Sequence, residues 1–240
     1  SETLQRIFDG HGSVLGSQMA DESSRYDVLK KTDFPKPQRT RRIAVANQKG
    51  GVGKTTSTVN TAAALANKGA QVLVIDMDPQ GNASTALGVS HASGEPSVYD
   101  VIEGRSDLGD VITVCPDFPT LDVVPASIDL SGAELEVADL PNRNTLLKEA
   151  LDLYLRQSDK HYDYVFIDCP PSLGLLVINA MCAVTEMLIP IQAEYYALEG
   201  LGQLINTIGL VQEHFNPVLL VSTMLVTMFD RRTLDRKSVV

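Results

Sequence analysis

Glycines, a lysine and two threonines stand in close succession near residue 50, and side chains of these types can hold phosphate. The stretch reads Lys49-Gly50-Gly51-Val52-Gly53-Lys54-Thr55-Thr56. Glycines let the backbone curl so that successive N–H groups point at phosphate oxygens. Lys54 is placed to reach the β- and γ-phosphates of a nucleotide, and the Thr55 hydroxyl is placed to bind Mg²⁺. The stretch therefore predicts a phosphate-binding loop.

The elements around this loop support the same interpretation. An apolar run, Ile43 to Ala46, precedes the loop and predicts a buried strand. A helix is expected from Thr55 to Lys68, with Gly69 as its C-cap. The positive N-terminus of such a helix would face the phosphates. A loop of this composition can arise by chance, but its place between a predicted strand and a predicted helix argues against a chance occurrence.

Two further apolar runs end in acidic residues. Val72 to Ile75 is followed by Asp76 and Asp78, and Tyr164 to Ile167 is followed by Asp168. An apolar strand that closes on aspartate is the Walker B arrangement, in which the acid holds Mg²⁺, often through water. A turn-forming Asp-Pro would explain Asp78 but not the pair of acids that frame one residue. Both strand ends therefore belong beside the predicted phosphate loop.

Apolar runs alternate with helical patterns over most of the chain. Further strands are expected at Leu121 to Val124, Met187 to Ile189 and Val218 to Val226, and helices at Asn142 to Gln157 and Ala197 to His214. Nearly continuous apolar strands are typical of a parallel sheet buried on both faces. The sequence thus predicts a single α/β domain of the P-loop NTPase type, with a doubly wound, mostly parallel sheet and helices on both faces.

Composition limits the classes of function. The chain has 240 residues, 44% of them hydrophobic, and a net charge of −10, so nucleic-acid contact would need a local basic cluster. Its three cysteines share no C-x-x-C spacing, and the four histidines lie far apart. These features predict neither a disulfide framework nor a zinc site. The sequence contains no run of 18 apolar residues, and a cytoplasmic setting is expected.

Residues 1–40 differ from the rest, and the domain is expected to cover residues 41–240. The first segment is rich in Gly, Ser, Asp and Lys and predicts a mostly disordered arm, with a short helix near Leu4 to Phe8. Its end is basic, with Lys30, Lys31, Lys36, Arg39, Arg41 and Arg42 against Asp33. A solvated basic linker and an arm that touches DNA both remain open interpretations.

One detail of the loop departs from the general P-loop pattern. Gln48 stands where a glycine is usual, and Lys49 adds a second lysine five residues before Lys54. This arrangement resembles the deviant Walker A box of the ParA/MinD superfamily. Further boxes resemble the chromosomal ParA (Soj-type) partitioning proteins of bacteria, and the similarity runs from about Arg42 to Thr233. These boxes begin at Asp76, Asp168, Ile189, Glu194 and Met228.

The resemblance implies an ATPase that uses ATP and Mg²⁺ and forms a homodimer around two nucleotides. Lys49 would reach across the interface to the nucleotide of the partner, and Asp78 would orient the attacking water. Lys49, Lys54 and Asp78 are therefore the expected catalytic residues. Asp76 would lie near the Mg²⁺ shell, which makes Thr55, Asp76 and Asp168 the expected metal group. The nucleotide would be bound by Lys49, Gly50, Gly51, Val52, Gly53, Lys54, Thr55, Thr56 and Met228.

The resemblance also implies partners. Family members bind DNA without sequence preference in the ATP state, act with a centromere-binding ParB-type protein, and segregate chromosomes or plasmids. A nucleoid-associated location follows, without membrane binding. Arg231 and Arg232 are the expected DNA contacts, with a solvated loop near the adenine site as the alternative.

The chain departs from the family after the Met228 box. Leu234 to Val240 does not resemble the expected continuation, so a truncated chain and a different natural end are both open. A MinD-like, membrane-associated positioning ATPase is the nearest rival function, although Thr233 to Val240 is short and mixed for an amphipathic membrane helix. Other rivals are an iron–sulfur protein of the nitrogenase type and a scaffold that binds nucleotide without hydrolysis.

Overall fold

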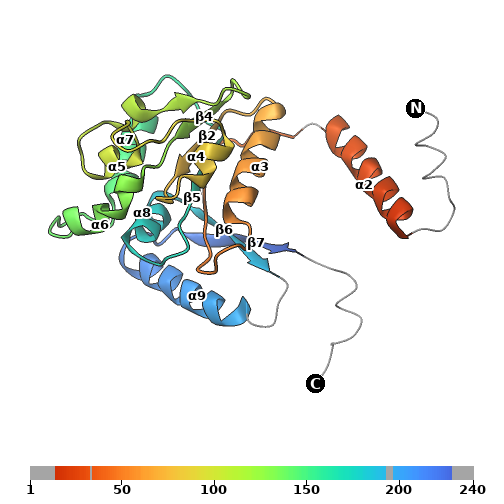
Figure 1. Cartoon of the computed structure of the whole chain (residues 1–240). Coiled ribbons are helices and arrows are strands. Elements are labelled where there is room, and N and C mark those ends of the chain that lie inside the picture. Colours follow the sequence, from red (N-terminus) through yellow and green to blue (C-terminus); the bar gives the residue numbers. More distant parts are fainter. Residues whose placement is uncertain (1–13, 33, 193–196, 229–240) are drawn as a thin grey trace. The chain divides into compact units, whose positions relative to one another are not determined.

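The computed structural model describes residues 14–32, 34–192 and 197–228 (Figure 1). The chain divides into two compact units, residues 1–35 and residues 36–240. The described part of the first unit is one helix, α2 (Val14–Lys31). The second unit contains the strands β1 (Arg41–Val45), β2 (Val72–Asp76), β3 (Thr113–Val114), β4 (Leu121–Val124), β5 (Tyr164–Asp168), β6 (Glu186–Gln192) and β7 (Leu220–Thr227). Its helices are α3 (Lys54–Asn67), α4 (Asn82–Ala86), α5 (Val98–Ile102), η1 (Leu108–Val111), η2 (Ile128–Ser131), α6 (Ala133–Glu136), α7 (Leu146–Gln157), α8 (Leu175–Ala183) and α9 (Ala197–His214).

The strands form one sheet in the order β3-β4-β2-β5-β1-β6-β7. Only β3 is antiparallel to its neighbour among these strands. Parallel strands need crossover connections, and helices supply them along this chain. The predicted α/β class with a mostly parallel sheet is confirmed.

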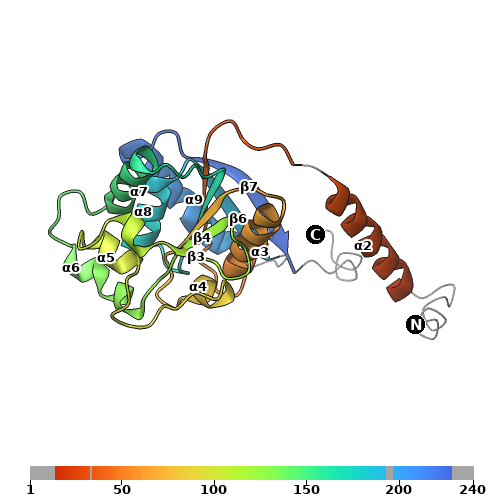
Figure 2. The same cartoon turned by 90° about the horizontal axis from the view of Figure 1, so that it is seen from above.

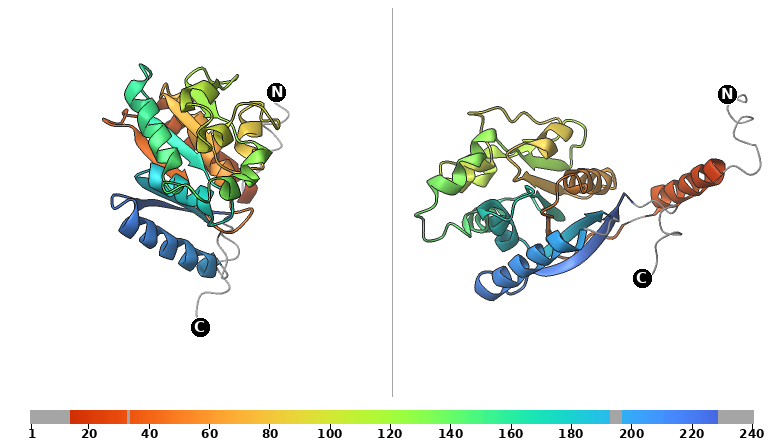
Figure 3. Two further views of the ribbon diagram at one scale, coloured as in Figure 1. Left: turned by 90° about the vertical axis from the view of Figure 1, so that its left-hand side faces the viewer. Right: turned by 60° about the horizontal axis from the view of Figure 1, so that its bottom comes forward.

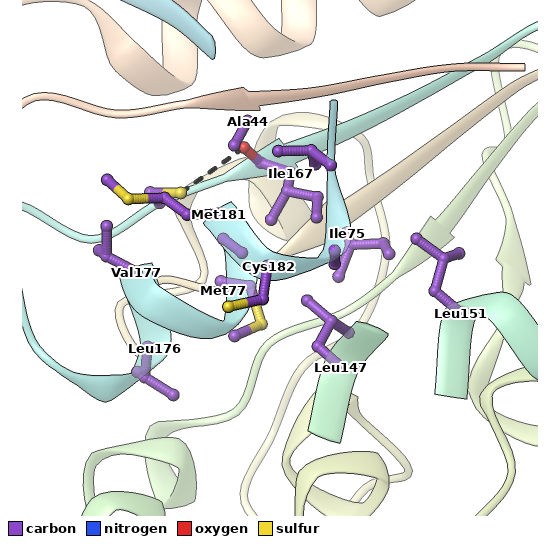
Figure 4. Packing of buried hydrophobic residues seen from close by; sticks show 14 of the residues in the cluster. Ala44, Ile75, Met77, Leu147, Leu151, Ile167, Leu176, Val177, Met181 and Cys182 are labelled. Carbon is purple, nitrogen blue, oxygen red and sulfur yellow. Dashed lines mark hydrogen bonds between the residues drawn. The ribbon is translucent and has the colours of Figure 1, made fainter. Parts of the chain in front are cut away.

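Side chains on the central strands alternate between two hydrophobic clusters, as a pleated strand requires. On β1, Ala44 joins one cluster, whereas Ile43 and Val45 join the other. The Ala44 cluster is covered by α5, α7, α8 and α9, and the Ile43 cluster by α3. Figures 2 and 3 show helices on both faces of the sheet, and Figure 4 shows Leu147, Met181, Ala44 and Ile167 as members of one cluster. The sheet is therefore buried on both faces at its centre.

Strand register aligns the carboxyl ends of β1, β5 and β2 with one another. Val45 pairs with Asp168 on β5, and Asp168 pairs with Asp76 on β2. The chain leaves β1 directly into the residue 47–53 loop and enters α3 at Lys54. The phosphate loop and the acidic residues therefore meet at the carboxyl edge of β1, β5 and β2, where doubly wound sheets bind ligands.

The N-terminal segment differs from the expected disordered arm in part of its length. Val14–Lys31 forms the helix α2, with Lys30 and Lys31 in its last turn. Those cations favour the negative end of the helix. Its residues carry no apolar stripe, which explains why periodicity did not indicate it. The predicted helix near Leu4 to Phe8 lies outside the described residues.

Two residues just before the expected domain boundary at residue 41 contact the folded chain. The Thr40 hydroxyl donates to the Tyr162 carbonyl at 2.7 Å, and Lys36 forms an ion pair with Asp163 at 3.2 Å. These contacts attach the last residues of the basic segment to the residues just before β5. The second compact unit accordingly starts at Lys36.

Strand β7 is present as predicted, but it is not buried. Most of its side chains are exposed, and the consecutive residues Met224, Leu225 and Val226 show exposure on both faces. The strand lies at the sheet edge and pairs with β6 alone among the described strands. An apolar run therefore predicted the strand correctly and its burial wrongly, because burial depends on which elements lie beside it.

Candidate active site

The loop between β1 and α3 is held in a tight curl. Gly51 and Gly53 have φ angles of 72° and 91°, which L side chains rarely adopt. The Lys54 ammonium donates to the Lys49 carbonyl at 3.0 Å and so closes the loop on itself. At the base of the loop, Asn47 accepts from the Lys49 N–H at 3.0 Å and donates to the Pro190 carbonyl at 2.7 Å.

The start of α3 offers the donors that a phosphate needs. The Ser57 N–H donates to the Gly53 carbonyl at 2.9 Å, one turn earlier. The N–H groups of residues 54–56 precede that bond and have no partner within the helix. They point out of the positive helix end, which favours anions.

The end of β7 is attached to the same loop. The Thr227 hydroxyl donates to the Val52 carbonyl at 2.9 Å. A β-carbon at Gly53 would lie 3.6 Å from Thr227 Cγ2. Met228 follows directly, has a positive φ of 54° and is 62% exposed. Met228, one of the residues expected to bind the nucleotide, therefore lies one residue beyond a contact with the loop.

Asp168 links the end of β5 to the first turn of α3. It accepts from the Thr55 hydroxyl at 2.6 Å and from the Thr58 hydroxyl at 3.0 Å. The carboxylate is fully buried, and burial is the main cause that raises the pKa of Asp168 to about 7. The charges of Asp76 and Asp78 act in the same direction, while the threonine hydroxyls oppose them.

Asp76 is also fully buried, but its carboxylate stabilises the turn that follows β2 by accepting hydrogen bonds. It accepts from the Ser84 N–H at 2.8 Å, from the Ser84 hydroxyl at 2.7 Å and from the Asp78 N–H at 3.2 Å. Burial raises the pKa of Asp76, and these hydrogen bonds counteract that rise. Asp78 in turn accepts from the Gln80 N–H at 3.0 Å. The acids on β2 thus shape the segment that leads into α4.

Lys54 is the cation that faces these carboxylates. Its side chain is buried, and burial lowers its pKa, whereas the charges of Asp168 and Asp78 raise it. Three buried acids share one strand edge with a single buried lysine, so the site can accept further positive charge. A Mg²⁺ ion fits here because Thr55 and Asp168 are oxygen ligands of the kind it prefers, and the phosphates of a nucleotide fit against the α3 N-terminus.

The structure brings most of the predicted residues together. The loop residues 49–56, Asp76, Asp78 and Asp168 all lie at the carboxyl edge of the sheet. Arg231 and Arg232 lie outside the described residues. The individual roles of all these residues stay predictions.

Sequence reasoning missed three residues that support the site. Thr58 follows Lys54 by four residues and donates both to the Lys54 carbonyl and to Asp168. Helical spacing would have placed it on the same face of α3. Ser84 and Thr227 carried no comparable signal, because their contacts with Asp76 and Val52 depend on turns and strand pairing that are not local.

Comparison with known proteins agrees with this geometry. Residues 40–221 match the model of a family described as an AAA domain. The sporulation initiation inhibitor protein Soj of Bacillus subtilis is 51% identical over 191 residues, which cover 80% of this chain and 74% of the relative. The chromosome partitioning protein ParA of Caulobacter vibrioides is 46% identical over 190 residues, with coverage of 79% and 70%.

A solved structure shares the fold. It is a cobyrinic acid a,c-diamide synthase from Mycobacterium smegmatis with bound ATP analogue and magnesium. Its TM-score is 0.74 and its identity 38%, and the match covers 83% of this chain and 81% of that one.

The sheet order, the glycine-rich loop at the start of α3 and the strand-final acids define a P-loop ATPase. Its relatives place it more narrowly. The chain belongs to the ParA/Soj family of chromosome-partitioning ATPases. In the part of the chain that the structure describes, no helix is both long and apolar enough to cross a bilayer.

Proposed function

We propose that this protein is an ATP-driven switch that dimerises around ATP and Mg²⁺, binds DNA without sequence preference, and segregates chromosomes or plasmids with a ParB-type partner. The observation that carries the proposal is the loop itself. It places Lys49 and Lys54 in one hydrogen-bonded curl beside Asp168. The Caulobacter vibrioides relative supports the role in segregation through its name as a chromosome partitioning protein.

In the proposed hydrolysis of ATP, each of these side chains has a separate role. Lys54 and the N–H groups at the start of α3 hold the phosphates and stabilise the charge that develops on them. Thr55 and Asp168 would hold Mg²⁺, which would supply positive charge to the phosphates when bound. Asp78 orients the attacking water, and Asp76 keeps the segment that carries Asp78 in place through Ser84.

Dimerisation follows from the position of Lys49 and Gly50. In the proposal, Lys49 reaches the nucleotide of the partner subunit and supplies charge in trans, as an arginine finger does elsewhere. A β-carbon at Gly50 would have nothing within 4 Å in the described chain. A β-carbon at Gly50 is therefore tolerated within this subunit, and a loss of dimerisation with ATP binding intact would report contact with a second molecule.

The experiment is sedimentation velocity of the Gly50→Val variant with ATP and Mg²⁺. The variant is expected to bind ATP like the parent and to stay monomeric, because the added side chain enters the space of the partner subunit. Gly202→Val is the matched control, since a β-carbon at Gly202 also has nothing within 4 Å and the residue lies on α9. The control should dimerise with ATP. An ATP-dependent dimer of Gly50→Val would contradict the proposed dimer.

DNA binding is the second part of the switch. Arg231 and Arg232 are the proposed phosphate contacts, and a ParB-type protein is the proposed activator of hydrolysis. Binding to a duplex should require ATP and should weaken with salt, with a slope of about 0.9 per phosphate neutralised. A salt series with ATP, with ADP and without nucleotide tests this point. Equal binding in all three states would remove the nucleotide switch and the proposed association with the nucleoid.

A further inference from the structure

A second pocket, the amino-end pocket, lies at the opposite end of the sheet from the phosphate loop. Its volume is about 530 Å³. It lies where β1, β6 and β7 begin and beside α7 and the last turn of α8, and its lining includes Arg39, Arg42, Lys148, Leu155, Arg156 and Val184. The phosphate loop follows the other end of β1. Because these strands are parallel, the two sites lie at opposite edges of the sheet.

The charge of this pocket is opposite to that of the chain. Its lining contains four cations, Arg39, Arg42, Lys148 and Arg156, and one carboxylate, Asp152, which gives a net charge of +3. The whole chain carries −10. Asp152 is shared between Arg42 at 2.5 Å and Lys148 at 2.6 Å. Neither Arg39 nor Arg156 forms an ion pair or a side-chain hydrogen bond with any residue that the structure describes.

The two unpaired guanidinium groups belong to backbone segments that the folded domain holds in place. Thr40 and Lys36 fix the segment that carries Arg39 through Tyr162 and Asp163. Arg156 lies in the last turn of α7. Both cations are therefore attached to the folded domain.

The floor of the pocket is apolar. Cys182, Ala183 and Val184 line it and are each 2% exposed, and Leu155 adds a wall from α7. Apolar lining with a few convergent polar groups is the usual make-up of a small-molecule site, and the volume lies within the usual range.

The end of α8 would normally repel an anion, because the last carbonyls of a helix carry negative charge. Here those carbonyls are already bonded. The Asn216 amide donates to the carbonyls of Met181 at 2.8 Å and of Val184 at 2.7 Å, and Arg42 donates to that of Ala183 at 3.5 Å. The negative helix end is thus largely neutralised, and the cations of the rim dominate.

We propose that the amino-end pocket binds a small organic phosphate, with the phosphate between Arg39 and Arg156 and the apolar part of the molecule on the floor. Guanidinium groups bind phosphate through paired N–H donors, which makes arginine well suited to this role. Duplex DNA fits less well, because Arg42 and Lys148 are directed onto Asp152 within the pocket and do not form a row on an open surface. Binding here does not depend on the nucleotide in the phosphate loop.

The test is calorimetric titration of the full chain with phenyl phosphate, with saturating ADP and Mg²⁺ present to fill the phosphate loop. Inorganic phosphate is titrated in parallel. The Arg39→Ala/Arg156→Ala variant is expected to bind phenyl phosphate at least about tenfold more weakly, since it loses charge-assisted hydrogen bonds. Thr185→Glu, which adds a negative charge to the exposed lining, should weaken binding as well.

The matched control is Arg25→Ala/Lys31→Ala, which removes the same charge from exposed positions of α2. It should bind phenyl phosphate like the parent. Equal weakening in the control, or no phenyl phosphate binding once ADP fills the loop, would overturn the proposal. Equal affinity for inorganic and phenyl phosphate would overturn the role of the apolar floor. Loss of duplex binding in the double variant, with phenyl phosphate binding intact, would assign the two arginines to DNA instead.

Discussion

Carboxylates have different partners at the two ends of the parallel strands, called here the carboxyl edge and the amino edge. At the carboxyl edge, Asp76, Asp78 and Asp168 are all buried, and their partners within the chain are hydroxyl groups, N–H groups and one buried lysine. At the amino edge, Asp152 meets Arg42 and Lys148 directly at hydrogen-bond distance.

The difference concerns the carboxylates: the three acids of the carboxyl edge depend on positive charge from outside the chain, whereas Asp152 is paired within it. Uncompensated buried carboxylates cost free energy and are found mainly where a ligand or a metal ion supplies the missing charge. Ion pairs that are satisfied within the chain do not need a ligand. Substitutions at the carboxyl edge should therefore change activity and ligand response, whereas those at the amino-edge ion pairs should change stability.

The largest effect is expected for Lys54→Ala. Loss of the ammonium that faces the β- and γ-phosphates should lower the rate of phosphate release by roughly a hundredfold or more, as removal of a preorganised charge donor does in other sites. The measurement is steady-state phosphate release with Mg²⁺ and ATP. Lys68→Ala removes the same charge at the far end of α3 and should keep the parental rate. A parental rate in Lys54→Ala would contradict the assigned site.

An intermediate effect is expected for Asp168→Asn. Mg²⁺ and ADP at a hundred times their dissociation constant should stabilise the parent by about 2.7 kcal/mol, and much of this gain should disappear in the variant because its metal ligand is lost. Calorimetric melting with and without Mg²⁺ measures the difference. Asp163→Asn, just before the amino end of the same strand, should keep the Mg²⁺ response. An unchanged response in Asp168→Asn would remove this acid from the metal group.

The smallest effect is expected for Asp152→Ala at the amino edge. Loss of a half-buried carboxylate shared by Arg42 and Lys148 should lower the free energy of unfolding by roughly 1 to 2 kcal/mol and leave phosphate release unchanged. Urea unfolding measures the stability, and Asp117→Ala at an exposed position is the control.

The pH dependence of this effect has a defined sign. Burial acts to raise the pKa of Asp152, but the bonds from Lys148 and Arg42 outweigh it and lower the pKa below its ordinary value of 3.8. A lowered pKa in the folded state contributes stability above pH 3.8 that is lost as the pH falls through the folded value. The parent and the variant should therefore converge in acid. A gap that widens below pH 3.8 would contradict the pairing.

The sequence predicted the parts of the fold that rest on local pattern. β1, β2 and β5 are nearly continuous apolar runs, and each ends where a residue of the site begins, so their type and place could be read directly. Their order in the sheet could not. β5 lies between β1 and β2 although it follows β2 by about ninety residues, because strand pairing is decided by long-range packing.

The same limit applies to the sites. The phosphate loop is a continuous motif, so its residues could be named from the sequence alone. The partners of Asp76 and Val52, namely Ser84 and Thr227, come from turns and from an edge strand. The amino-end pocket is assembled from separate segments of the domain, and only Arg39 and Arg42 of its basic residues belong to the charged stretch seen near residue 40. Chemistry that converges from several elements leaves no spacing in the sequence.

Val45, Asp76 and Asp168 lie at the same register position on three neighbouring strands. This register also limits where the protein can gain or lose residues during evolution. Neighbouring side chains on a strand face opposite sides of the sheet, so the loss of one residue within β5 would exchange the two hydrophobic faces and move Asp168 away from Thr55. Insertions and deletions should therefore accumulate in the connections, such as the segment between α6 and α7. The number of residues in the central strands should stay constant among functional homologues.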